Sequence, residues 1–131
     1  MSTDKDQFNI SIVGHCTPDS FALRSAIAGF LPNARTEVIN DESELTRRLG
    51  EFDLHLLNRV MEGRFHTESA LEFIETHHEH HKGLMLISNF PESREQSVKV
   101  GGAPGFGKRS MRSDEARDAL YSALGINQTT N

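Results

Sequence analysis

Short apolar runs alternate with amphipathic stretches along most of this chain, and this alternation is the feature that most restricts its fold. The clearest runs are 8–13, 53–57 and 83–87, the last reading Gly-Leu-Met-Leu-Ile. Their apolar density suits strands that are buried on both faces. Strands that alternate with amphipathic helices predict an α/β domain, in which helices cover both faces of one parallel sheet.

The alternation predicts five strand–helix pairs within one domain over residues 8–125, between polar ends at 1–7 and 126–131. The predicted strands are 8–13, 35–39, 53–57, 83–87 and 105–107, and the predicted helices are 17–31, 41–52, 68–78, 92–100 and 113–124. The segment 105–107 (Gly-Phe-Gly) has poor strand propensity and is assigned only because the alternation requires a fifth strand there.

Polar residues at the predicted helix starts support these assignments. Thr17 is expected to cap its helix, with Pro18 at the first helical position. Asp41 and Glu44 have the spacing of a capping box, Ser113 is expected to cap the last helix, and Gly125 to end it.

The composition limits the function classes. The 131 residues suit one domain, and the formal net charge of -5 gives no general attraction to nucleic acid. No signal peptide and no apolar run long enough to span a membrane are found. The single cysteine, Cys16, excludes an internal disulfide and fits a reducing cytoplasm, where we expect the protein to act.

An open parallel sheet places its functional crevice at the carboxyl ends of the strands. The alternation therefore predicts which side chains meet there, without any reference to a known protein. These residues are Gly14, His15 and Cys16, then Asn58 and Arg59, then Ser88 and Asn89, and finally Lys108.

The order and spacing of these residues resemble those of a response-regulator receiver domain over nearly the whole chain. Asn58 and Ser88 are 30 residues apart and Ser88 and Lys108 are 20 apart, both typical of that family, and Met61 follows Asn58 by three. The segment Gly102-Ala103-x-Gly105-Phe106 is similar to the one before the family's lysine. The resemblance implies a flavodoxin-like (βα)5 three-layer sandwich with five parallel strands in the order 2-1-3-4-5.

The sequence departs from the receiver pattern where the chemistry occurs. The family has two acids where Gly14 and His15 stand, and a phosphorylated aspartate where Asn58 stands. An asparagine amide cannot form an acyl phosphate, and Mg²⁺ needs the missing carboxylates. We therefore expect no phosphorylation at Asn58, no Mg²⁺, no cofactor and no enzyme activity.

The resulting expectation is a stand-alone receiver-like signal-transduction domain that acts by protein–protein interaction. Its partner would be a sensor kinase or another signalling protein, with neither nucleic acid nor membrane involved. A homodimer through residues 92–124 is also implied by the family.

Two interpretations of the remaining pocket stay open. Lys108 has no obvious anionic partner in the sequence, so its ammonium either points into water or binds an anion or metabolite, which is the alternative function. Ser88 and Phe106 match the family's output switch, but Phe106 stands one residue later than the usual aromatic. A one-residue shift reverses a strand side chain unless a bulge corrects it, so we interpret Phe106 as a core residue.

Two histidine features have simpler explanations than chemistry. His77, His78 and His81 have helical spacings that can bind a transition metal, but no further ligand is placed by the sequence. We predict no metal site, because histidines near a helix end also complement its dipole. His15 and Cys16 are adjacent, which rarely gives the geometry of a nucleophile and its base.

Overall fold

The structure is a computed structural model that describes residues 7–66 and 69–126. The strands are β1 (Asn9–Val13), β2 (Arg35–Ile39), β3 (Leu54–Asn58) and β4 (Leu84–Ile87). The helices are α1 (Thr17–Phe30), α2 (Glu42–Arg47), α3 (Ala70–His77), α4 (Pro91–Lys99) and α5 (Asp114–Ala123), with short 3-10 turns η1 (Leu49–Glu51) and η2 (Lys108–Ser110). The four strands form one parallel sheet in the order β2-β1-β3-β4.

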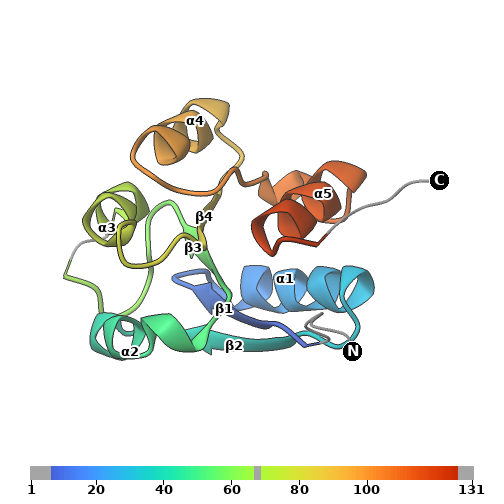
Figure 1. The fold of residues 1–131 in the computed structure, drawn as a ribbon, viewed down its shortest axis with the longest axis horizontal. Coiled ribbons are helices and arrows are strands. Elements are labelled where there is room, and N and C mark those ends of the chain that lie inside the picture. The colour runs from blue at the N-terminus through green and yellow to red at the C-terminus, as the bar shows by residue number, and fades with distance from the viewer. Residues whose placement is uncertain (1–6, 67–68, 127–131) are drawn as a thin grey trace.

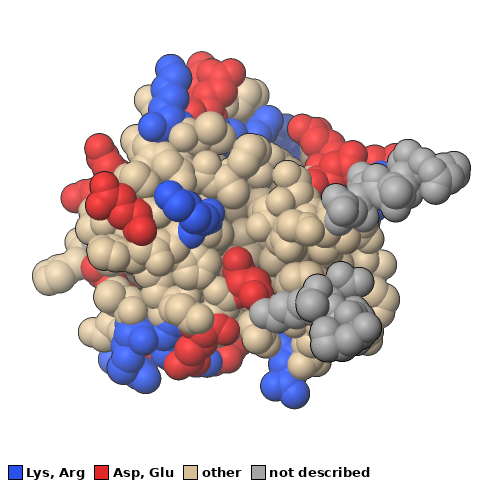
Figure 2. Space-filling view, in the orientation of Figure 1, with Lys and Arg blue, Asp and Glu red and all other residues tan. Residues whose placement is uncertain are grey.

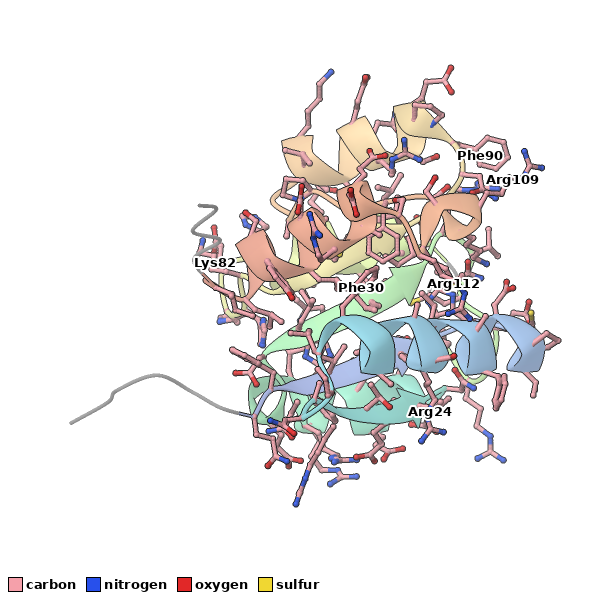
Figure 3. All side chains as sticks on the ribbon, turned by 90° about the vertical axis from the view of Figure 1, so that its right-hand side faces the viewer. Arg24, Phe30, Lys82, Phe90, Arg109 and Arg112 are labelled. Carbon is pink, nitrogen blue, oxygen red and sulfur yellow. The ribbon has the colours of Figure 1, made fainter. Side chains whose placement is uncertain are left out.

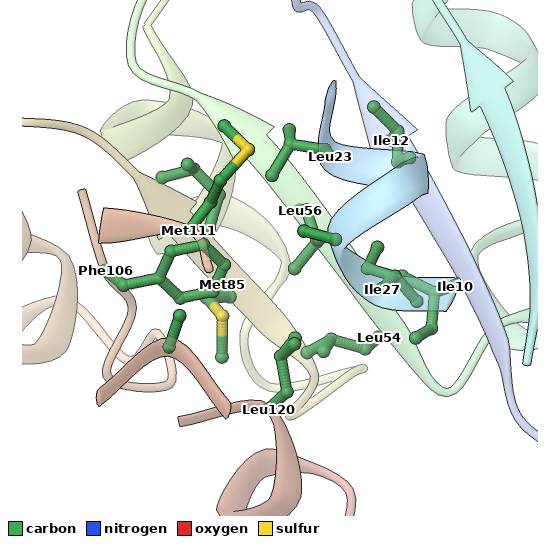
Figure 4. Packing of buried hydrophobic residues seen from close by; sticks show 13 residues of the cluster. Ile10, Ile12, Leu23, Ile27, Leu54, Leu56, Met85, Phe106, Met111 and Leu120 are labelled. Atoms are coloured by element: carbon green, nitrogen blue, oxygen red, sulfur yellow. The ribbon is translucent and has the colours of Figure 1, made fainter. Parts of the chain in front are cut away.

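The helices cover the sheet in two layers. Helices α1 and α5 lie on one face, α2 and α3 on the other, and α4 lies beside β4 (Figure 1). The α1/α5 face buries Ile10, Ile12, Leu54, Leu56, Met85, Ile87 and Phe106 (Figure 4). The opposite face buries Val13, Ile39, Leu57, Phe73, Ile74, Leu84 and Leu86. Because side chains alternate across each strand, both faces are apolar, and this explains the continuous apolar runs in the sequence.

The predicted fifth strand at 105–107 is wrong. The described chain forms only four strands, although 103–106 runs along the outer edge of β4 and makes an isolated parallel bridge from Ala103 to Met85. The backbone of Gly105 lies so close to β4 that an added Cβ would be 2.0 Å from the carbonyl oxygen of Leu86. The segment therefore contacts the sheet edge without forming a regular ladder.

Two backbone hydrogen bonds show that this segment contains one extra residue. The N–H of Ala103 donates to the Leu84 oxygen (2.8 Å), and the N–H of Ser88 donates to the Phe106 oxygen (3.0 Å). In a regular parallel ladder the second acceptor would be Gly105. The bulge brings Phe106 to that position, and its side chain is 1% exposed within the α1/α5 core.

Most predicted boundaries lie within two residues of the observed ones, and β2 matches completely. The side chains of Asp41 and Ser113 cap α2 and α5 as predicted. The cap of α1 is Cys16 and not Thr17, and its side chain makes no capping hydrogen bond to the helix backbone. The predicted helix 41–52 is divided into α2 and η1, and the predicted start of α3 at 68 lies outside the described residues.

Within 7–66 and 69–126, the helices are all too short or too polar to cross a membrane. On the face seen in Figure 2, acidic and basic side chains are interspersed. This face therefore presents no extended surface of one charge.

Candidate functional site

A shallow cavity of about 340 Å³ lies at the carboxyl ends of β3 and β4. Its lining consists of Asn58, Arg59, Val60, Ile87, Ser88, Asn89, Phe90, Lys108 and Arg109. Five of the predicted site residues therefore do meet at one edge of the sheet. Gly14 and His15 lie next to this cavity without lining it, and Cys16 caps α1.

The side chain of Asn58 holds two segments of the backbone together through its amide nitrogen. Its amide nitrogen donates to the carbonyl oxygen of Gly14 (3.0 Å) and to that of Val60 (2.6 Å). The first bond ties β3 to the end of β1, and the second closes the turn after β3. Only an amide can make both bonds, because an ionised carboxylate has no hydrogen to donate.

Gly14 has a backbone conformation that excludes the family's acid at this position. Its φ is +75°, and an added Cβ would lie 2.7 Å from both Cα and Cβ of Met61. Met61 is 3% exposed, so it cannot move aside into solvent without leaving the core. The oxygen of Gly14 also accepts from the N–H of Glu62 (2.9 Å). The loop after β3 thus occupies the space that an acidic side chain at position 14 would need.

We predict that Gly14→Ala lowers the free energy of unfolding by about 2 kcal/mol, from the left-handed backbone and the contact with Met61. The matched control is Gly29→Ala in α1, where an added Cβ meets nothing within 4 Å. This control is expected to raise stability by about 0.5–1 kcal/mol, since alanine favours a helix. Urea unfolding of both variants measures the difference, and equal effects of the two substitutions would contradict the crowding at Gly14.

His15 is a buried neutral side chain, 2% exposed. Its Nε2 lies 3.0 Å from the carbonyl oxygen of Leu56 and therefore carries the proton, which it donates. Its Nδ1 has no hydrogen-bond partner among the described residues. Burial lowers the pKa of His15 from 6.5 to about 4, and nearby Lys108 adds to this effect. A neutral ring without a free donor toward an anion fills the place of the family's second acid.

Lys108 does have an anionic partner, which corrects the expectation drawn from the sequence. Its Nζ donates to Oδ2 of Asp19 at 2.8 Å. This hydrogen bond is the main reason that the pKa of Asp19 lies below its usual value, and a hydrogen bond with Cys16 adds to it. Asp19 lies in the first turn of α1, where an acid also complements the helix dipole. The position of Asp19 in the first turn of a predicted helix was the only feature of the sequence that pointed to this residue.

The switch residues of the family have ordinary structural partners here. The hydroxyl oxygen of Ser88 accepts from the N–H of Phe90 (3.1 Å), and Ser88 is 4% exposed. Its carbonyl oxygen accepts from the guanidinium of Arg94 (2.6 Å). Together these bonds fix the turn between β4 and α4, and Phe106 packs in the core.

The histidines at the end of α3 and directly after it do not converge. The ring of His77 packs against Phe73 with centroids 4.2 Å apart, and His78 packs against Gly101. His81 donates to the Phe52 oxygen (2.7 Å) and accepts from the N–H of Gly83 (2.8 Å). In the described part of the chain, no three potential ligands lie together as a metal site.

The fold is that of response-regulator receiver domains. The RcsB response regulator from Salmonella typhimurium superposes with a TM-score of 0.69 at 16% identity, over 97% of this chain and 65% of that one. The receiver domain of RcsB from Escherichia coli gives 0.66 at 16% identity, over 95% and 99%. The receiver domain of NarL from Mycobacterium tuberculosis gives 0.67 at 15% identity, over 92% and 99%. No family model and no curated protein sequence matches the chain.

Proposed function

We propose that this chain is a receiver-like signal-transduction domain that acts through protein–protein contact and is not phosphorylated at residue 58. It has no catalytic role in this proposal, and its partners are signalling proteins such as a sensor kinase. The receiver fold supports the signalling role. The state of the pocket supports independence from phosphorylation.

One observation carries the second half of the proposal, namely that the amide of Asn58 donates to two backbone carbonyl groups. The residue where the family has a nucleophile is thus a structural clamp. Gly14 is closed off by Met61, and Lys108 is already paired with Asp19. Among the described residues of the pocket, a phosphoryl group would find no carboxylate nucleophile, no carboxylate pair for a metal ion and a lysine that is already paired.

The test is incubation of the protein with acetyl phosphate and Mg²⁺, and separately with beryllofluoride and Mg²⁺. We expect no added phosphoryl group by intact mass, and no amide shifts around the cavity by NMR. A phosphorylated product that maps to this pocket would contradict the proposal. An ordinary receiver domain treated in parallel shows that the reagents are active.

The alternative, a small-anion or metabolite module that uses Lys108, fits the structure less well. The ammonium of Lys108 is neutralised by Asp19, and the donors of Asn58 are used by the backbone. We predict that adding inorganic phosphate to several millimolar leaves the melting temperature unchanged beyond the effect of the same ionic strength of chloride. A saturable rise that disappears in Lys108→Gln would favour the alternative.

A further inference from the structure

We infer that the rim of the cavity is a docking surface for an acidic segment of a partner protein that also carries apolar side chains. This surface consists of Arg59, Val60, Phe90 and Arg109, and we call it the Arg–Phe rim. The inference rests on the proposed function, because it identifies where the protein–protein contact occurs and which chemistry recognises it.

The charge of the cavity is opposite to that of the chain. Its lining contains Arg59, Lys108 and Arg109 and no acidic residue, although the whole chain has a formal net charge of -5. Lys108 is paired with Asp19, so it adds little to binding. Within the described residues, Arg59 and Arg109 are not in ion pairs with a carboxylate. Two guanidinium groups at one edge complement carboxylates of a partner, which they can bind bidentately.

The same rim exposes two apolar side chains next to its cations. Phe90 is 54% exposed and Val60 is 45% exposed, and both line the cavity. The guanidinium carbon of Arg59 lies 5.0 Å from the centre of the Phe90 ring. Figure 3 shows Phe90 and Arg109 together at one end of the molecule. Exposed aromatic and arginine side chains are the residue types that contribute most to protein–protein binding.

The backbone beneath the rim is already fixed, which lowers the entropy cost of binding. The N–H of Phe90 donates to Ser88, and its oxygen accepts from Ser93 and Arg94. The N–H of Arg109 donates to Oδ1 of Asn89 (2.9 Å), which ties η2 to the turn before α4. A surface that is ordered before its partner arrives loses less conformational entropy on binding.

An acidic peptide segment fits this surface better than a nucleic acid does. Phosphate backbones bind to stripes of many cations, whereas this rim offers two unpaired ones on a chain with net negative charge. The exposed Phe90 and Val60 instead require apolar side chains next to the carboxylates. A short segment that alternates Asp or Glu with Leu, Ile or Phe meets both requirements.

The test is selection of peptides from a random library on the folded full chain, followed by affinity measurements on the enriched sequences. We expect these peptides to combine acidic with apolar residues. Arg59→Gln and Arg109→Gln should each weaken binding about fivefold, and Phe90→Ser about tenfold. The matched control is Arg24→Gln, an exposed arginine of α1 that lies away from the rim (Figure 3) and is expected to leave the affinity unchanged. Circular dichroism checks that each variant folds.

Three outcomes would overturn the inference. They are a selection that enriches no acidic apolar peptide, enriched peptides whose affinity does not change in the rim variants, and a DNA duplex that competes for the rim at physiological salt. Acetyl phosphate treatment is run on the same samples, so the two proposals fail separately. A protein that becomes phosphorylated and still binds the peptides through the rim would contradict only the proposal that it acts without phosphorylation.

Discussion

The variant Asn58→Asp is expected to be less stable than the natural protein by about 3 kcal/mol at pH 7, and still to take no phosphoryl group. The new carboxylate would lie against the oxygens of Gly14 and Val60, which now accept from the amide at 3.0 and 2.6 Å. Two donated hydrogen bonds would be replaced by two repulsive contacts. For a chain of this length the loss corresponds to a fall in melting temperature of roughly 10 °C.

The pH dependence distinguishes this cause from a general disturbance of the fold. A carboxyl group surrounded by carbonyl oxygens has a higher pKa in the folded than in the unfolded protein. The penalty is therefore complete above the raised pKa of the folded state, shrinks as the pH falls through that value, and is gone near the ordinary aspartate pKa of about 4. Differences in unfolding free energy between variant and natural protein at pH 7 and pH 5 measure it.

The matched control is Asn33→Asp, which makes the same chemical change at an exposed turn position between α1 and β2. It is expected to change stability by less than about 0.5 kcal/mol at either pH. The contrary result would be an Asn58→Asp variant that is as stable as this control and becomes phosphorylated with acetyl phosphate. The pocket would then be a receiver site in which the amide of Asn58 is the only obstacle to phosphorylation. That result would remove the main support for the proposed function.

The meeting of Asn58, Ser88 and Lys108 at one sheet edge could be predicted because it follows from periodicity. Apolar runs of strand length alternating with amphipathic helices force a parallel sheet, and parallel strands end at the same edge. The caps at Asp41 and Ser113 were predictable for a similar reason, since a cap depends on residues only three positions apart. Local rules therefore determined most of the framework.

The interactions that decide the chemistry are not local, and the sequence did not reveal them. Asp19 and Lys108 are 89 positions apart, and nothing in either segment indicates that they pair. The space next to Gly14 is filled by Met61 through a loop whose path depends on the hydrogen bonds of Asn58. The sequence showed which acids were missing, and the structure shows what replaced them.

The failed prediction of a fifth strand has a related cause. The alternation correctly required a segment along the edge of β4, and 103–106 does lie there. Whether such a segment forms a ladder depends on whether every second N–H stays opposite a carbonyl oxygen of β4. Between Ala103 and Phe106 the extra residue breaks this order, because Gly105, which has no side chain, lies with its Cα against the Leu86 oxygen and Phe106 becomes the next acceptor.

Acid is expected to destabilise this protein strongly between pH 6.5 and pH 4, because two buried histidines are neutral in the folded state. Burial lowers the pKa of His15 and of His55 from 6.5 to about 4. His55 is fully buried on β3, donates from Nε2 to the Leu49 oxygen (2.9 Å), and accepts at Nδ1 from the hydroxyl of Ser11. Both rings are almost completely buried, so the solvent cannot stabilise a charge on either of them.

The sign of the effect follows from proton uptake. Between pH 6.5 and 4 the unfolded chain binds protons at these histidines and the folded chain does not, so stability falls as the pH falls. Each histidine contributes up to about 3 kcal/mol, fully present above pH 6.5 and lost as the pH approaches 4. Urea unfolding at a series of pH values measures this slope.

Replacing one histidine separates this mechanism from acid unfolding through carboxylates. His55→Gln keeps a donor toward Leu49 but cannot titrate, so it should lower stability at pH 7 by about 1–2 kcal/mol and make the slope between pH 6.5 and 4 shallower. His80→Gln, at an exposed position after α3, should leave the slope unchanged. An unchanged slope in His55→Gln would mean that folding does not lower the pKa of His55, and it would contradict this mechanism.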